Sequence, residues 1–140
     1  MDTLQQIYSF LGLVRANNLW SWGAANENAV VLQVWTDEIK KSEFGLFFIV
    51  LKNRGEDYQS PGYKERLEHL AQIQKGKKCY LLKCTAKDEG RTSPREMESF
   101  DSKTLFQSNN KIEIDEDGNQ MIQVLKRVSL GEAKTDIEKN

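Results

Sequence analysis

The chain has 140 residues, of which 39% are hydrophobic and 29% are charged, and its formal net charge is −1. This length and composition are typical of one globular domain that buries its own core. No run of about 18 apolar residues occurs, so we expect no membrane-spanning helix. A nearly neutral chain also lacks the overall basic charge of proteins that bind nucleic acid through phosphates alone.

The two cysteines indicate a reducing compartment. Cys79 and Cys84 lie five residues apart on a predicted strand, which places them on opposite faces and prevents a disulfide bond between them. The N-terminal sequence MDTLQQIYSFLGLV has an acidic residue at position 2 and lacks the basic segment of a signal peptide. We therefore expect a cytoplasmic protein.

The first quarter of the chain predicts a helix followed by a β-hairpin. Apolar residues at helical spacing, ending with Val14, predict a helix over residues 3–15 that stops at Asn17 and Asn18. Residues 19–35, LWSWGAANENAVVLQVW, predict two strands joined by a polar turn at residues 26–28.

The second strand of this hairpin alternates between two faces. Its even-numbered residues are apolar and predict a core face. Its odd-numbered residues include Gln33 and Trp35, and they predict a face that is half-buried or lines a groove.

The middle of the chain predicts two strands and a helix. Residues 36–43 are a charged connection, and residues 45–51, GLFFIVL, are apolar on both faces, as expected for a strand covered on both sides. Ser60 and Pro61 predict the start of a second helix. Its predicted buried stripe consists of Tyr63, Leu67, Leu70 and Ile73. Residues 78–86 predict a further strand.

The C-terminal part predicts strands and then a disordered tail. Residues 95–100 predict a short strand, and Leu105 and Phe106 predict an isolated apolar pair beneath a loop. Residues 111–128 predict a hairpin that turns at Asp117-Gly118. In this hairpin two residues of the first strand, Ile112 and Ile114, are expected to face inward opposite Ile122 and Val124.

The sum of these elements is two helices and about six strands, with the strands mostly in hairpins. We therefore predict an α+β fold with a mainly antiparallel or mixed sheet curled into an open barrel. Residues 1–130 are predicted to form one domain, and residues 131–140 a disordered tail with almost no apolar residues.

The sequence predicts no metal site and no cofactor. His69 is the sole histidine and lies four residues after Glu65, with which we expect it to pair loosely. Residues 115–119, DEDGN, have the composition of a calcium loop, but the glycine is fourth instead of sixth, so they predict a hairpin turn. No glycine-rich phosphate-binding motif occurs.

One pattern is typical of an enzyme. Asp37, Glu38 and Lys40 follow a predicted strand, and Glu27 lies upstream. A carboxylate, one spacer and a lysine after a strand is the arrangement found in metal-dependent nucleases of the PD-(D/E)xK type. The pattern is common by chance, so a nuclease is kept only as an alternative.

The three tryptophans lie within residues 20–35. A single tryptophan is most often a core residue. Trp20 and Trp22 are two residues apart, however, and share one face of an extended strand, where they would form a platform for a flat ligand such as a base. The predicted ligand-binding residues are Trp20, Ser21, Trp22, Asn18, Gln33 and Trp35, and the predicted contacts to a nucleic-acid backbone are Arg15, Lys40, Lys41 and Arg95.

The segments WSWGA, VVLQVW, GYKERLEHLAQIQKG, SPRE and SFD resemble a set of small uncharacterised bacterial proteins over residues 20–128. The size and order of the elements are similar to PUA-like domains of the EVE and YTH kind. That resemblance implies a curled sheet that reads a modified base in DNA or RNA with an aromatic cage. Two alternatives stay open: a protein-interaction factor in a defence or phage system, and the metal-dependent nuclease.

Overall fold

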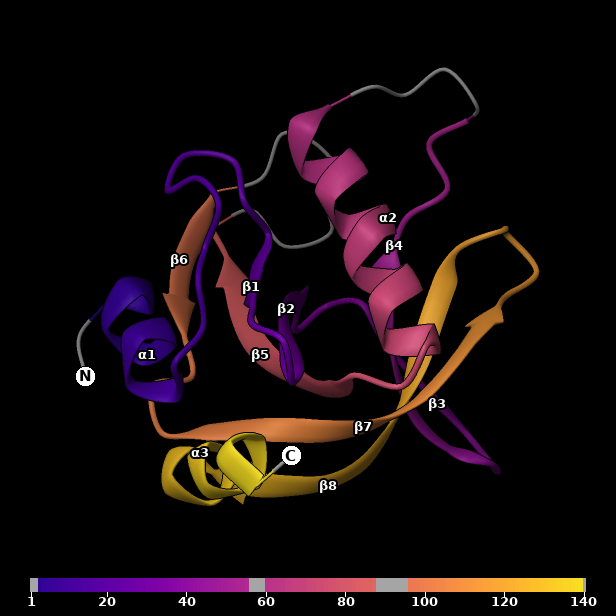
Figure 1. Ribbon diagram of the computed structural model, residues 1–140. Helices are drawn as coiled ribbons and strands as arrows, with labels where there is room; N and C mark the ends of the chain where they lie inside the picture. Colours follow the sequence, from indigo (N-terminus) through magenta and orange to yellow (C-terminus); the bar gives the residue numbers. More distant parts are fainter. Residues whose placement is uncertain (1–2, 56–59, 88–95, 140) are drawn as a thin grey trace.

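The structure is a computed structural model that describes residues 3–55, 60–87 and 96–139. Within these residues, eight strands form one curved sheet, and three helices pack against it (Figure 1). In chain order they are α1 (Leu4–Leu11), β1 (Gly23–Ala25), β2 (Ala29–Trp35), β3 (Ile39–Ser42), β4 (Gly45–Leu51), α2 (Pro61–Gln74), β5 (Lys78–Ala86), β6 (Met97–Phe100), β7 (Thr104–Ile114), β8 (Gln120–Ser129) and α3 (Leu130–Lys139). None of these described helices is long and apolar enough to cross a membrane.

The sheet is mixed and mostly antiparallel. Its strands follow the order β1-β2-β5-β7-β8-β4-β3, and β6 pairs with the C-terminal end of β5. Only β2 and β5 are parallel among these pairs, and β3, β4 and α2 form the crossover that a parallel pair requires. The predicted α+β class and sheet type are confirmed. The sheet is not closed into a barrel, because β1 and β3 remain the two ends of the strand order.

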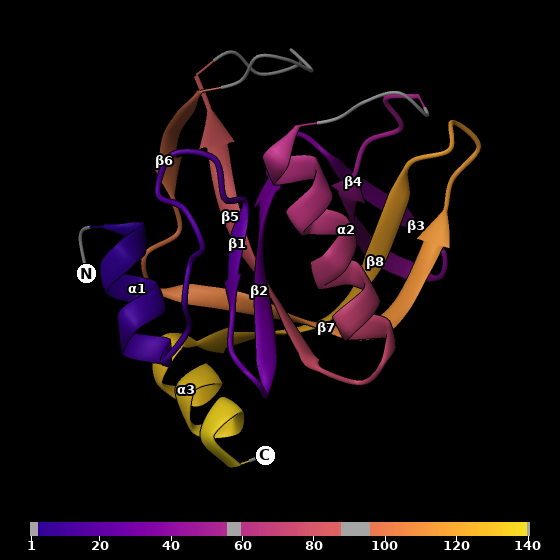
Figure 2. The same cartoon turned by 45° about the horizontal axis from the view of Figure 1, so that its top comes forward.

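Two apolar cores cover the two faces of the sheet. One core packs against α1 and α3, which lie side by side, and the other packs against α2 (Figure 2). Along β2, Val30 and Leu32 belong to the α2 core, whereas Val31 belongs to the α1/α3 core, so the predicted alternation is confirmed and both faces are buried. Cys79 and Cys84 are free, buried thiols in different cores, on opposite faces as predicted.

The first helix is shorter than predicted. Thr3 and Gln6 form a capping box at its start, and Gly12 ends it in the left-handed conformation with φ 77°. Val14 therefore lies outside the helix and is 72% exposed. Apolar spacing alone extended the predicted helix to residue 15, because such spacing takes no account of this glycine stop.

The predicted hairpin forms, but its first strand contains only three residues. The Asn26 side chain accepts hydrogen bonds from the backbone N–H groups of Asn28 and Ala29, which fixes the turn. Trp20 and Trp22 precede β1, and residues 18–20 form a turn, so the alternation of an extended strand does not apply to them. The charged connection after β2 also differs from the prediction, because it contains β3.

Helix α2 begins as predicted, with Ser60 accepting a hydrogen bond from the Tyr63 N–H and Pro61 in the first turn. Leu70 and Ile73 of the predicted stripe are buried, but the rest of the buried face differs from the prediction. Leu67 is 42% exposed, whereas Arg66 and His69 are buried. The helix is thus rotated relative to the predicted stripe, because these two polar residues occupy the face that meets the sheet.

The last hairpin is longer than predicted. Leu105 and Phe106 are not an isolated pair but part of β7, which pairs with both β5 and β8. Ile112 lies opposite Ile122 as predicted, whereas Ile114 lies opposite Gln120 and is 70% exposed.

The C-terminal segment is a helix, so the predicted disordered tail is wrong. Ser129 and Glu132 exchange hydrogen bonds at the start of α3, which forms a capping box. Ala133 and Ile137 are buried against the α1/α3 core. Leu130, at the start of the helix, is buried in the same core, and Asp136 accepts hydrogen bonds from Lys78 and Tyr80, so apolar and polar contacts together dock this segment on the sheet.

Candidate functional site

The segment that carries two of the tryptophans, residues 17–22, is a compact loop held by its own hydrogen bonds; we call it the tryptophan loop. The backbone carbonyl of Asn17 accepts a hydrogen bond from the Ser21 N–H at 3.0 Å, and the Ser21 hydroxyl accepts one from the Asn17 N–H at 2.9 Å. The Asn17 side chain accepts a further bond from the Leu19 N–H at 2.8 Å. Leu19 is 95% exposed at the tip of this loop.

The tryptophan loop is attached to the first turns of α2. The buried Ser21 hydroxyl donates a hydrogen bond to Glu65 Oε2 at 3.1 Å. The Trp22 ring lies against Gly62, where an added Cβ would come within 2.5 Å of the ring. Glycine at this position therefore lets the loop and the helix approach closely.

The three tryptophans do not form one cage. Trp22 packs against the α2 core and Trp35 against the α1/α3 core, so these two rings lie on opposite faces of the sheet. Trp20 is half-buried and belongs to neither core of the described residues. A cage built from all three rings, as the sequence predicted, is therefore wrong.

The other predicted ligand-binding residues are also divided between the tryptophan loop and the face of the sheet that carries Trp35. Ser21 and the exposed Asn18 belong to the tryptophan loop. Gln33 lies on the face of Trp35, where its amide donates a hydrogen bond to the Tyr8 hydroxyl at 2.9 Å. The Gln33 side chain is thus engaged away from the tryptophan loop, and only its backbone N–H bonds to the loop, at the Trp22 carbonyl.

Arg66 is the residue that sequence reasoning missed. Its guanidinium is buried and donates hydrogen bonds to the carbonyl of Val50 in β4, to that of Trp22 at 2.8 Å and to that of Gln33 in β2 at 2.9 Å. β2 and β4 are not paired in the sheet, so Arg66 closes the seam between them. Burial lowers the pKa of Arg66 to about 10, which leaves it charged at neutral pH.

Three polar atoms in neighbouring turns of α2 are buried without a hydrogen-bond partner. They are Glu65 Oε1, Arg66 Nε and His69 Nδ1. The expected pair between Glu65 and His69 does not form. A buried polar atom without a partner costs about 1–3 kcal/mol, so a water molecule or a polar ligand atom that bonds to it is favoured there.

The buried histidine makes stability depend on pH. Burial, together with the charges of Arg66 and Lys77, lowers the pKa of His69 to about 4 from its usual 6.5. The unfolded chain therefore binds more protons between these values, and stability falls as the pH falls through this range. We expect a loss of about 1–2 kcal/mol between pH 7 and pH 5 in urea unfolding experiments.

Replacement of this histidine by glutamine should make stability nearly constant over the same range. The carboxylate of Asp115, whose pKa is lowered to about 2, contributes at lower pH only, because its contribution is lost below its usual value of 3.8. A wild-type protein as stable at pH 5 as at pH 7 would contradict this prediction.

The predicted backbone contacts do not surround the tryptophan loop. Arg15 is half-buried, with its guanidinium 5.6 Å from the centre of the Tyr8 ring. Lys40 and Lys41 belong to β3, which lies on the other side of α2 from the tryptophan loop in both views (Figures 1 and 2). Arg95 lies outside the described residues.

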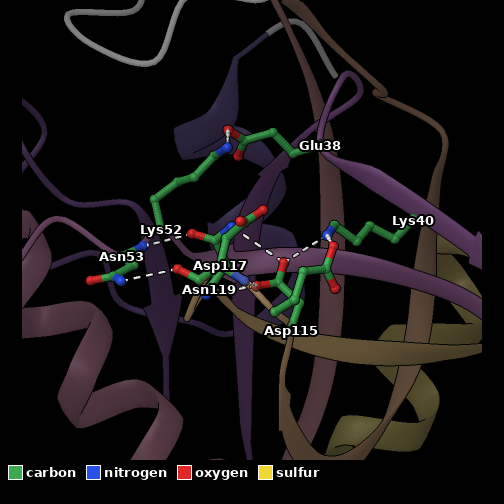
Figure 3. Close-up of polar contacts among 8 residues, drawn as sticks. Glu38, Lys40, Lys52, Asn53, Asp115, Asp117 and Asn119 are labelled. Atoms are coloured by element: carbon green, nitrogen blue, oxygen red, sulfur yellow. Dashed lines mark hydrogen bonds and ion pairs between the residues drawn. The ribbon is translucent and has the colours of Figure 1, made fainter.

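Lys40 is part of a structural cluster at the β7–β8 turn (Figure 3). Its ammonium lies 2.7 Å from Asp115 Oδ2, and this carboxylate also accepts hydrogen bonds from the N–H groups of Asp117 and Asn119. Burial acts to raise the pKa of Asp115, but the bond from Lys40 and those from the turn outweigh it and lower the pKa to about 2. The predicted hairpin turn is confirmed.

The residues of the nuclease hypothesis do not converge. Glu38 pairs with Lys52 at 3.5 Å and Lys40 with Asp115. Glu27 and Asp37 flank the seven-residue strand β2, which at about 3.3 Å per residue separates them by roughly 20 Å. The arrangement that the nuclease alternative requires is therefore not formed, and no other group of His, Cys, Asp or Glu side chains in the described residues could hold a metal ion.

A concave surface is lined in part by the Lys40 cluster. It is an open groove of about 580 Å³ between β3, β4 and the β7–β8 hairpin. Phe47 and Met121 contribute apolar surface, and Phe44 and Ile114 are 75% and 70% exposed beside them. An exposed apolar patch of this kind is typical of a protein-contact surface.

No protein-family model matches this chain, and neither a curated protein nor a solved structure matches it.

Proposed function

We propose that the protein is a non-enzymatic binding module whose tryptophan loop holds a nucleobase, including a modified base, of single-stranded or flipped-out nucleic acid. Trp20 is the side chain proposed to stack on the base. The observation that carries this proposal is its position: it is half-buried on a hydrogen-bonded loop, outside both cores, and adjacent in sequence to Ser21, whose hydroxyl bonds to Glu65. Stacking on an aromatic ring contributes about 1–3 kcal/mol per base.

Glu65 supplies the polar contact of this proposal. One of its oxygens is occupied by the Ser21 hydroxyl, and the other is buried without a partner. A carboxylate oxygen accepts a hydrogen bond from the exocyclic amine of adenine, cytosine or guanine. The similarity of the size and order of the elements to PUA-like domains of the EVE and YTH kind favours the same class of ligand.

The test is a titration of intrinsic tryptophan fluorescence with free nucleosides. Adenosine and cytidine, with and without methylation of the base, are expected to quench the emission, and Trp20→Ala should weaken binding by about tenfold or more. Glu65→Gln should weaken it as well, because an amide presents both a donor and an acceptor where only an acceptor is favourable.

Trp35→Phe is the matched control. This tryptophan packs against the α1/α3 core on the opposite face of the sheet, so its replacement should leave nucleoside binding unchanged. Loss of quenching in Trp35→Phe but not in Trp20→Ala would contradict the proposed position. If no nucleoside quenches the emission of the wild-type protein, base binding is wrong.

Protein binding through the groove beside β3 is the second candidate function. The exposure of Phe44 and Ile114 favours it. This groove lies away from the tryptophan loop, so a failed nucleoside titration would leave it as the leading candidate.

A further inference from the structure

On the α2 side of the sheet, two basic side chains lie beside one aromatic ring. They are Lys83 of β5 and Arg127 of β8, and the ring is that of Phe106 in β7. The ammonium of Lys83 lies 5.3 Å from the centre of the Phe106 ring, and the guanidinium carbon of Arg127 lies 5.2 Å from it. We call these three residues the basic aromatic patch. Phe106 packs against the α2 core, the core that also contains Trp22.

The sheet itself positions this patch. Leu81 pairs with Phe106 and Phe106 pairs with Arg127 across three neighbouring strands, so their side chains share one face. Lys83 lies two residues after Leu81 on the same strand and faces the same way. The Phe48 ring supports Phe106 from the core, with 5.8 Å between the ring centres.

Neither cation forms an ion pair with a carboxylate of the described residues. Other lysines form ion pairs there, such as Lys78 with Asp136 and Lys52 with Glu38. Asp101 lies within electrostatic range of Lys83, but its carboxylate accepts three hydrogen bonds from Lys103 and Thr104. Two like charges beside one ring repel each other, and an anion placed between them would remove that repulsion.

We infer that the basic aromatic patch binds the phosphate backbone of the single-stranded nucleic acid whose base enters the tryptophan loop. This inference rests on the proposed function and replaces Lys40 and Lys41 as backbone contacts. Charge complementarity carries it, because a backbone supplies the anion that Lys83 and Arg127 lack. The half-buried Phe106 ring adds a surface on which a neighbouring base can stack.

The test measures the salt dependence of binding to a fluorescein-labelled single-stranded DNA of about ten nucleotides. Each phosphate contact to a single strand contributes about 0.7 to the slope of log K against log salt. The double variant Lys83→Gln/Arg127→Gln should therefore reduce this slope by about 1.4 and bind more weakly at low salt. Free adenosine, which has no phosphate, should bind the double variant as tightly as the wild type.

Lys134→Gln is the matched control, because Lys134 also lies 5.3 Å from a phenylalanine ring, that of Phe10, but on α3. It should leave the slope unchanged. An equal reduction in Lys134→Gln, or an unchanged slope in the double variant, would overturn the inference. A wild-type protein that binds no nucleoside, with a DNA affinity that still depends on Lys83 and Arg127, would overturn the proposed function and support the phosphate contact.

Discussion

Replacement of Arg66 by methionine is expected to lower the free energy of unfolding by about 3–5 kcal/mol. Methionine keeps much of the side-chain volume but donates no hydrogen bond. The carbonyls of Val50 and Gln33 would then lose their bond to the guanidinium, and that of Trp22 would keep only the N–H of Gln33. Urea unfolding followed by circular dichroism at pH 7 measures this loss.

The matched control is Leu67→Ala, one residue further along α2. Leu67 is 42% exposed, so its truncation should cost less than about 1 kcal/mol. Arg66→Lys should give an intermediate loss, because one ammonium cannot reach all three carbonyls with the geometry of a guanidinium. A loss below about 1 kcal/mol for Arg66→Met would show that the seam between β2 and β4 does not depend on this side chain.

Replacement of Gly62 by alanine is expected to destabilise the protein by about 2 kcal/mol or more. Alanine normally favours a helix by about 1 kcal/mol over glycine. Here the added Cβ would lie 2.5 Å from the Trp22 ring and 2.8 Å from the Trp20 carbonyl oxygen. The tryptophan loop would have to move away from α2, so nucleoside binding should weaken together with stability.

Gly131→Ala in α3 is the matched control, for which we expect a change in stability of the opposite sign to that of Gly62→Ala. The nearest atom to a Cβ at this position is the Ser129 hydroxyl, 3.9 Å away, so alanine fits without a clash. We expect it to stabilise the protein by about 0.5–1 kcal/mol. If Gly62→Ala is neutral or stabilising, as Gly131→Ala is expected to be, contact between Gly62 and the tryptophan loop is not what limits that position.

The elements with local signals could be predicted from the sequence. Ser60 and Pro61 mark the start of α2, the Asn26 turn marks the first hairpin, and Asp117-Gly118 marks the last one. Each of these signals acts over a few residues, since a cap or a turn is stabilised by hydrogen bonds to its immediate neighbours. The sequence therefore predicted the α+β class and the mixed sheet, together with the opposite faces of Cys79 and Cys84.

The errors arose where apolar spacing was the sole guide. Leu67 fits a helical stripe as well as Arg66 does by position alone, and a leucine is the usual choice for a core. The tail after residue 130 contains few apolar residues, yet Ala133 and Ile137 dock it because the sheet offers a core on that side. Short strands such as β3 are also hard to find, because their stability comes from a partner strand.

The candidate site was predictable only where its residues lie close together in the sequence. The sequence pointed to Trp20, Ser21 and Trp22 because they are adjacent and chemically distinctive. It could not show that Trp35 lies on the opposite face, or that Glu65 approaches Ser21 across 44 residues. Contacts between distant segments follow from strand order and helix docking, which leave no mark in a short stretch of sequence.

Short-range patterns in the amino-acid sequence are thus sufficient to define most of the helices and strands, and to place alternate residues of β2 and the two cysteines of β5 on opposite faces of the sheet. The strand order, the burial of Arg66 and the meeting of Lys83, Phe106 and Arg127 arise only in the folded molecule. The physical reason is that a buried guanidinium becomes favourable only where several backbone carbonyls converge. That convergence exists only after β2, β4 and α2 have come together.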